Sequence, residues 1–153
     1  MTLTTAVRPQ RSLRKPIEQE RWHEETIHTT AEITPVVGEV IAAMEEADYP
    51  GRDVFAMHLA LGEALVNAIL HGNGDDPAKG VRVRYRVTDR RAQAQVEDEG
   101  PGFNPEEVAD PTAPENLDRP SGRGLLLMRS FMTWVRYNER GNWVSLCRER
   151  SES

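Results

Sequence analysis

Two stretches of this chain alternate strictly between apolar and polar residues. In residues 81–87 valine and tyrosine alternate with arginine, and in residues 92–98 alanine and valine alternate with glutamine and glutamate. A period of two is typical of a strand with one buried and one exposed face, so we interpret the arginine row as a solvated sheet face. By the same parity Asp98 points to the buried face, where a carboxylate is unusual. The pattern therefore predicts two strands, one of which delivers an acidic side chain into the interior.

Other apolar residues recur at helical spacing or in short extended runs. Three segments have helical spacing: residues 31–47, 54–71 and 124–131. Three stretches are expected as strands: residues 21–30, 132–138 and 143–148, the last two joined by a hairpin turn at 139–142. Pro35 suits the first turn of the first helix, and Asp53 is a plausible N-cap of the second. The sequence predicts an α+β fold, a two-layer sandwich in which three helices pack on one face of a mixed, mostly antiparallel sheet.

The helix expected at residues 54–71 carries one narrow polar stripe. On a helical wheel Glu63, Asn67 and His71 fall on one face among small alanines, and nearly every other position is apolar. A helix that is apolar over most of its circumference is buried. A buried carboxylate is costly unless it is paired or hydrogen-bonded, so the stripe should meet a ligand, an ion or a water-filled pocket. A satisfied polar cluster in the core is the alternative.

Two glycine pairs stand at the ends of predicted elements. Gly100 and Gly102 follow Asp98 at the end of its strand, and Gly122 and Gly124 stand where the last helix begins. Glycine permits a close approach of the backbone to a ligand, and the start of a helix is a natural phosphate site. The run G-x-x-x-x-G-K-[ST] of a P-loop is absent. Arg123, between the second pair, either touches a phosphate or lies on the surface.

The remaining segments are punctuated by polar residues and proline. Residues 1–19 are basic and poor in apolar side chains, so we expect a mostly disordered tail before a domain at residues 20–150. Residues 104–121 contain four prolines, and so long an insertion in a compact domain is typical of a functional lid.

Composition narrows the setting of the protein. A length of 153 residues suits one domain, and the single cysteine fits a reducing cytoplasm. The net charge of −6 argues against direct binding of nucleic acid. No apolar run of membrane-spanning length and no signal peptide are evident, so a cytoplasmic protein without a membrane partner is expected.

Three motifs, in order, resemble those of a known superfamily. Glu63-x-x-x-Asn67, Asp98-x-Gly100-x-Gly102 and Gly122-x-Gly124-Leu125 resemble the N, G1 and G2 boxes of the GHKL ATPases, which include gyrase, the histidine kinases and the MutL proteins. The compact runs at residues 67–73 and 122–130 look most like the anti-sigma factor serine kinases of bacteria. The resemblance covers roughly residues 22–148 and implies the Bergerat ATP-binding fold.

The resemblance also implies a role for each matching residue. Asp98 would accept a hydrogen bond from the adenine amino group, and Gly100 and Gly102 would make room for the base. Asn67 would ligate Mg²⁺, and Glu63 would act as general base. The other expected nucleotide contacts are His71 near the phosphates and the G2 box, which comprises Gly122, Arg123, Gly124 and Leu125. Many relatives carry a threonine in the last strand near the nucleotide, and Ser145 is the nearest candidate here.

The function that the resemblance implies is that of an anti-sigma factor with serine/threonine-protein kinase activity. Such a protein would bind ATP or ADP with Mg²⁺, sequester a sigma factor and phosphorylate a serine of an anti-sigma factor antagonist of the STAS type. A homodimer is also implied. The alternatives are a nucleotide-gated binding module with negligible turnover and a stand-alone ATPase domain of the histidine kinase type. The second is disfavoured because no phosphoacceptor helical hairpin precedes residue 22.

Overall fold

The computed structural model describes residues 21–102 and 122–152 of the chain. The tail expected at residues 1–19 and the lid expected at 104–121 lie outside this part.

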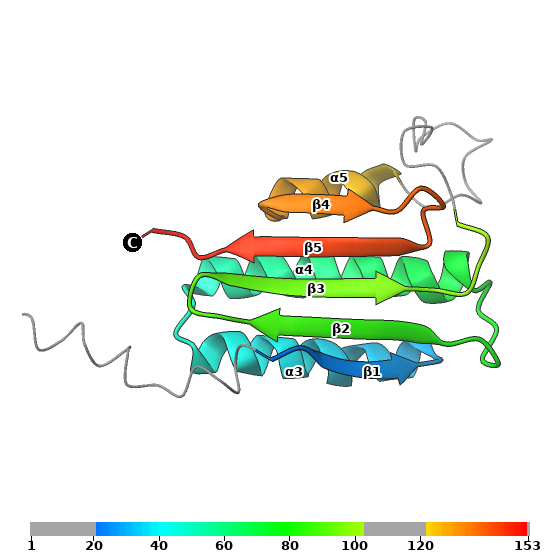
Figure 1. Ribbon diagram of the computed structural model, residues 1–153, viewed down its shortest axis with the longest axis horizontal. Helices are drawn as coiled ribbons and strands as arrows, with labels where there is room; N and C mark the ends of the chain where they lie inside the picture. The colour runs from blue at the N-terminus through cyan, green and yellow to red at the C-terminus, as the bar shows by residue number, and fades with distance from the viewer. Residues whose placement is uncertain (1–20, 103–121, 153) are drawn as a thin grey trace, which may run out of the picture.

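Five strands form one sheet in the order β1-β2-β3-β5-β4 (Figure 1). The strands are β1 (His23–Ile27), β2 (Val81–Val87), β3 (Arg91–Glu97), β4 (Trp134–Tyr137) and β5 (Trp143–Glu149). We expected a mixed, mostly antiparallel sheet, and every pairing among the described strands is antiparallel. Tight hairpins join β2 to β3 and β4 to β5, and such connections produce antiparallel neighbours.

The alternation in β2 and β3 is confirmed as burial on one face of the sheet. Val83 pairs with Val96 and Tyr85 with Ala94, and all four side chains are buried. The alanines of β3 are small enough for a helix to pack closely over them, and the central helix contacts both β3 and β5.

The three expected helices all cover the same face of the sheet (Figure 1). They are α3 (Ile33–Glu46), which follows the 3-10 turn η2 (Thr30–Glu32), α4 (Gly51–Val66), and α5 (Gly122–Phe131). The helix α4 continues without a break into a π-helical turn, η3 (Asn67–Gly72). Because α4 contacts both α3 and α5, it is the central element of the helical layer.

The N-cap expected at Asp53 is wrong. The helix α4 begins at Gly51 with Pro50 as its N-cap, and Asp53 lies inside the first turn, fully buried. Its carboxylate accepts hydrogen bonds from Arg148 Nε at 2.8 Å and from the Ser151 backbone N–H at 2.8 Å. The sequence around Asp53 contains no sign of these partners, which are almost a hundred residues away. Asp53 therefore ties the end of the described chain to the start of α4.

The helix that runs from Gly51 to Gly72 has 22 residues and contains an 18-residue window with a mean hydropathy of 1.5, so by length and composition it could cross a membrane. We expected no element of that kind. In this structure the buried side of the helix packs on the sheet and on α3 and α5, so its apolar character is that of a core helix.

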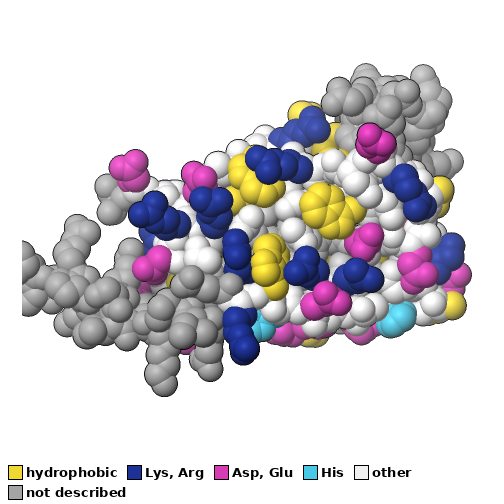
Figure 2. Space-filling view, in the orientation of Figure 1, with side chains coloured by type: hydrophobic (Ala, Val, Ile, Leu, Met, Phe, Trp, Pro, Cys, Tyr) yellow, Lys and Arg dark blue, Asp and Glu magenta, His cyan; other side chains and the backbone are white. Residues whose placement is uncertain are grey.

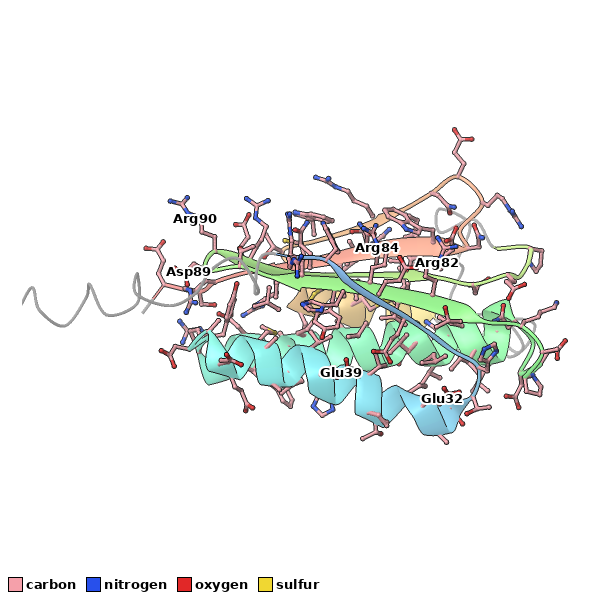
Figure 3. The ribbon with its side chains drawn as sticks, turned by 60° about the horizontal axis from the view of Figure 1, so that its bottom comes forward. Glu32, Glu39, Arg82, Arg84, Asp89 and Arg90 are labelled. Atoms are coloured by element: carbon pink, nitrogen blue, oxygen red, sulfur yellow. The ribbon has the colours of Figure 1, made fainter. Side chains whose placement is uncertain are left out.

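The other face of the sheet carries no helix from the described residues (Figure 1), and basic and hydrophobic side chains gather on it (Figure 2). Arg82 and Arg84 form ion pairs with Glu24, at 3.8 and 3.4 Å. The guanidinium groups of Arg84 and Arg86 lie 4.8 and 5.0 Å from the ring centroid of Trp22. Figure 3 shows Arg82 and Arg84 on the side of the sheet opposite to the helical layer. The arginine row thus lies on an uncovered sheet face, as the alternation predicted.

Candidate functional site

The polar stripe of the central helix faces a cavity between α4, α5 and the ends of β3 and β5. Asn67 and His71 line this cavity, together with the small side chains of Ala64 and Ala68. The helix is π-helical here, and the Asn73 backbone N–H donates to the Ala68 carbonyl at 2.8 Å, five residues back. Such π-helical turns are frequent at functional sites.

Asp98 stands at one end of the cavity, at the end of β3. Its side chain is 9% exposed, and its Oδ1 accepts a hydrogen bond from the Gly100 backbone N–H at 2.8 Å. Burial raises the pKa of the Asp98 carboxyl above its usual value, although the Gly100 N–H and Arg140 act in the opposite direction. No described residue donates a hydrogen bond to Oδ2, so this oxygen can accept one from a ligand.

Two glycines allow the backbone around Asp98 to pack closely. A Cβ on Gly72 would lie 2.3 Å from Asp98 Oδ2, and one on Gly100 would lie 1.7 Å from the Gly72 carbonyl oxygen. Both positions therefore exclude a side chain, and the turn after β3 lies directly against the end of the π-helical turn. Gly102 has a φ of +81°, which favours glycine, and it passes equally close to the Arg140 carbonyl.

Glu63 does not line the cavity; it lies against the start of α5, one turn before Asn67. A Cβ on Gly124 would lie 2.4 Å from Glu63 Oε2, so the carboxylate is in contact with the first turn of that helix. Gly122 is the first residue of α5. Leu125 is buried in the core and does not line the cavity, so only its backbone is available to a ligand. The side chain of Arg123 is not among those described.

The turn between β4 and β5 forms a wall of the site that our sequence analysis missed. Gly141 and Asn142 line the cavity beside Asp98, and Tyr137 lines it near α5. Burial raises the pKa of Tyr137 to about 12; the charge of Arg129 opposes this shift and that of Glu63 adds to it. The sequence of this turn predicted a hairpin but not its position beside Asp98, because that position depends on the pairing of β5 with β3.

Ser145 does not line the cavity. It pairs with Gln95 on the face of the sheet away from the helices, and its neighbour Val144 lines the cavity instead.

The donor groups of the site fit a magnesium ion that binds together with a nucleotide. Within residues 21–102 and 122–152 no group of three or more His, Cys, Asp or Glu side chains could hold a metal ion by itself. Mg²⁺ keeps several waters and takes phosphate oxygens with only one or two protein ligands. The amide oxygen of Asn67, one turn from Glu63 on the cavity side of the helix, suffices for such a site.

Comparison with known proteins adds independent evidence. Residues 27–148 match the family described as Histidine kinase-like ATPase domain. The chain is 31% identical over 94 residues to the serine/threonine-protein kinase BtrW of Bordetella bronchiseptica. The matched residues are 60% of this chain and 66% of that kinase, so the chain spans just under two thirds of the length of the kinase. It is 31% identical over 111 residues to an anti-sigma F factor of Clostridium perfringens, covering 70% of this chain and 79% of the relative. An anti-sigma F factor of Geobacillus is 34% identical over 100 residues, which are 63% of this chain and 67% of the relative.

Proposed function

The chain belongs to the histidine kinase-like ATPase domain family, and from that premise we propose that it is an ATP-binding anti-sigma factor with serine/threonine-protein kinase activity. It would act in the cytoplasm as a homodimer, sequester a sigma factor and phosphorylate a serine of a STAS-type antagonist.

 The names of its relatives support this proposal, since they are called anti-sigma F factors and a serine/threonine-protein kinase.

One observation carries the proposal. The Glu63 carboxylate and the Asn67 amide share one face of the central helix, and this face lies between buried Asp98 and the N-terminus of α5. Asp98 closes one end of the cavity, Asn67 lines it, and Glu63 touches Gly124 at the start of α5. A nucleotide bound with its base at Asp98 would extend its phosphates toward the first turn of α5, where backbone N–H groups favour anions.

In this arrangement each side chain has a separate task. Asp98 Oδ2 accepts a hydrogen bond from the adenine amino group. Asn67 would hold Mg²⁺, and the ion would supply positive charge to neutralise the transferring phosphoryl group. Glu63 takes the proton from the serine hydroxyl of the antagonist as that oxygen attacks the γ-phosphorus, and ADP leaves.

The test is single-turnover transfer of labelled γ-phosphate to the antagonist, with wild type compared to Glu63→Gln. Glutamine keeps the size and hydrogen bonding of glutamate but cannot take up the proton. Loss of a general base slows chemistry by about 10²–10⁴-fold, so we expect a slowing of that order with nearly unchanged ATP affinity.

Asn67→Ala serves as the companion variant, because it should weaken nucleotide binding and make it less dependent on Mg²⁺. Equal transfer rates for wild type and Glu63→Gln would contradict the role of Glu63. The absence of any transfer by wild type would leave a nucleotide-gated binding module as the better description. Light scattering of the purified chain tests the homodimer.

A further inference from the structure

The backbone of Asp98 is held from two sides by buried asparagines. On one side Asn142 donates from Nδ2 to the Asp98 carbonyl at 3.0 Å, and its own carbonyl accepts the Asp98 N–H at 2.9 Å. On the other side Asn73 Oδ1 accepts the N–H of Glu99, the next residue, at 2.8 Å. Asn142 is a hairpin residue that lines the cavity, whereas Asn73 lies behind Asp98 and does not line it.

Asn73 is a buried side chain with both of its polar groups satisfied. It is 4% exposed, and besides accepting from Glu99 it donates from Nδ2 to the Gly80 carbonyl at 3.1 Å. Gly80 in turn donates its N–H to the Glu99 carboxylate. These contacts join the end of the π-helical turn, the loop before β2 and the end of β3 in one closed network.

The consequence for Asp98 follows from the order of the hydrogen bonds along the turn. The Glu99 N–H is held by Asn73, and the next N–H, that of Gly100, is held by Asp98 itself. Without Asn73 the peptide group between Asp98 and Glu99 would be held, among the described residues, only through the Asp98 carbonyl, by Asn142 Nδ2, so it could tilt about that contact and move the N–H of Gly100 away from Oδ1. Asp98 lines the cavity, and the orientation of its carboxylate there depends on that geometry.

We propose that Asn73 is a positioning residue for nucleobase recognition, which aims the Asp98 carboxylate so that it selects adenine over guanine. This inference rests on the proposed function, because it assumes that Asp98 meets the base. Adenine presents a donor amino group where guanine presents a carbonyl oxygen, so a carboxylate discriminates between them only when it is held at that position.

The experiment measures the affinities for ADP and GDP by calorimetry in wild type and in Asn73→Leu, which keeps the size of the side chain without its polar atoms. Loss of the anchoring hydrogen bond should weaken ADP binding by about three- to tenfold. GDP binding should change less, so the ratio of the two affinities should fall. A residue with only a structural role would lower thermal stability without changing this ratio.

Two further variants make the result specific. Asn73→Asp keeps an acceptor for the Glu99 N–H and should retain a ratio close to that of wild type. Asp76→Ala removes the hydrogen bond from the Ala78 N–H to Asp76 Oδ1 in the same loop, away from Asp98, and should leave both affinities unchanged. If Asn73→Leu does not fold, Asn73→Ser takes its place, because serine is too short to reach the Glu99 N–H.

A double-mutant cycle with Asp98→Asn decides whether Asn73 acts through Asp98. In the Asp98→Asn variant, the added Asn73→Leu substitution should no longer change the ratio of ADP affinity to GDP affinity. A ratio that stays at the wild-type value in Asn73→Leu, or an effect that persists unchanged beside Asp98→Asn, overturns the positioning role while leaving the proposed function intact. A wild-type chain that binds neither nucleotide overturns both.

Discussion

The Asp98 carboxylate is placed for ligand contact in surroundings that disfavour its charge. Burial raises its pKa, so ionisation is harder in the folded than in the unfolded chain. The stability that the protonated form contributes is therefore present at acid pH and lost as the pH rises through the folded pKa. At neutral pH the charged side chain weakens the fold, as expected for a carboxylate with the proposed role of binding adenine.

This balance predicts opposite effects of Asp98→Asn on binding and on stability. ADP affinity should fall by roughly one to two orders of magnitude, because a hydrogen bond to a charged acceptor contributes about 1.5–3 kcal/mol. Without ligand the variant should melt a few degrees higher than wild type at pH 7, since each kcal/mol corresponds to about 2–4 °C in a chain of this size. Thermal scans at a series of pH values check the sign of this stability change, because the difference in melting temperature between the variant and wild type should vanish as the pH falls below the folded pKa of Asp98. A lower melting temperature at pH 7 would contradict it.

Single residues were predicted best where a local pattern decides their burial. The parity of β3 correctly placed Asp98 among the buried side chains, and the helical wheel placed Asn67 and His71 on the cavity side of one helix. Asn73 and Asn142 could not be found in this way. Their partners lie on other elements, and an asparagine in a loop is ordinary in sequence.

At the scale of elements, the end of β5 holds the ends of two helices together. Arg148 forms an ion pair with buried Asp53 of α4 and donates from Nη1 to the Phe131 carbonyl, at the end of α5, at 2.7 Å. Burial acts to raise the pKa of Asp53, but the hydrogen bonds from Ser151 and Arg148 outweigh it, so the pKa is lowered. This contribution to stability is present at neutral pH and is lost as the pH falls through the folded pKa.

We therefore expect Arg148→Met to destabilise the fold by about 3 kcal/mol, because it leaves a buried carboxylate without its cation. Urea unfolding at pH 7 measures the effect. The double variant Asp53→Asn with Arg148→Met should recover part of the loss, since no charge is then buried alone. Arg82→Met is the matched control: its ion pairs are exposed, and it should change the free energy of unfolding by less than about 1 kcal/mol. Equal effects of the two arginine substitutions would contradict this account.

The boundaries of elements followed from sequence to within a few residues, except where tertiary contacts decide them. The strand predicted at residues 143–148 is observed as Trp143–Glu149, and the helix predicted at 31–47 is Ile33–Glu46 after a 3-10 turn. The start of α4 was misplaced because Asp53 looks like a cap but serves a distant arginine. The π-helical turn has no signature in the apolar spacing and was not predicted.

At the scale of the whole molecule, the two-layer arrangement was predictable because apolar periodicity specifies which face of each element is buried. The position of β5 between β3 and β4 was not, since the order of strands depends on long-range pairing. That order brings the β4–β5 turn beside Asp98 and so completes the site. The described helices all lie on one face of the sheet and leave its other face uncovered (Figure 1).

The distribution of tryptophans between the cavity and the uncovered face gives the protein two optical signals. Trp22 and Trp134 are stacked with arginines, whereas Trp143 lines the cavity. Added nucleotide should therefore change the fluorescence of Trp143, and Trp143→Phe should abolish that response while Trp22→Phe retains it. A protein that covers the uncovered face would instead alter the emission of Trp22 and Trp134. Titrations of the single variants can thus separate ligand binding from assembly without an attached dye.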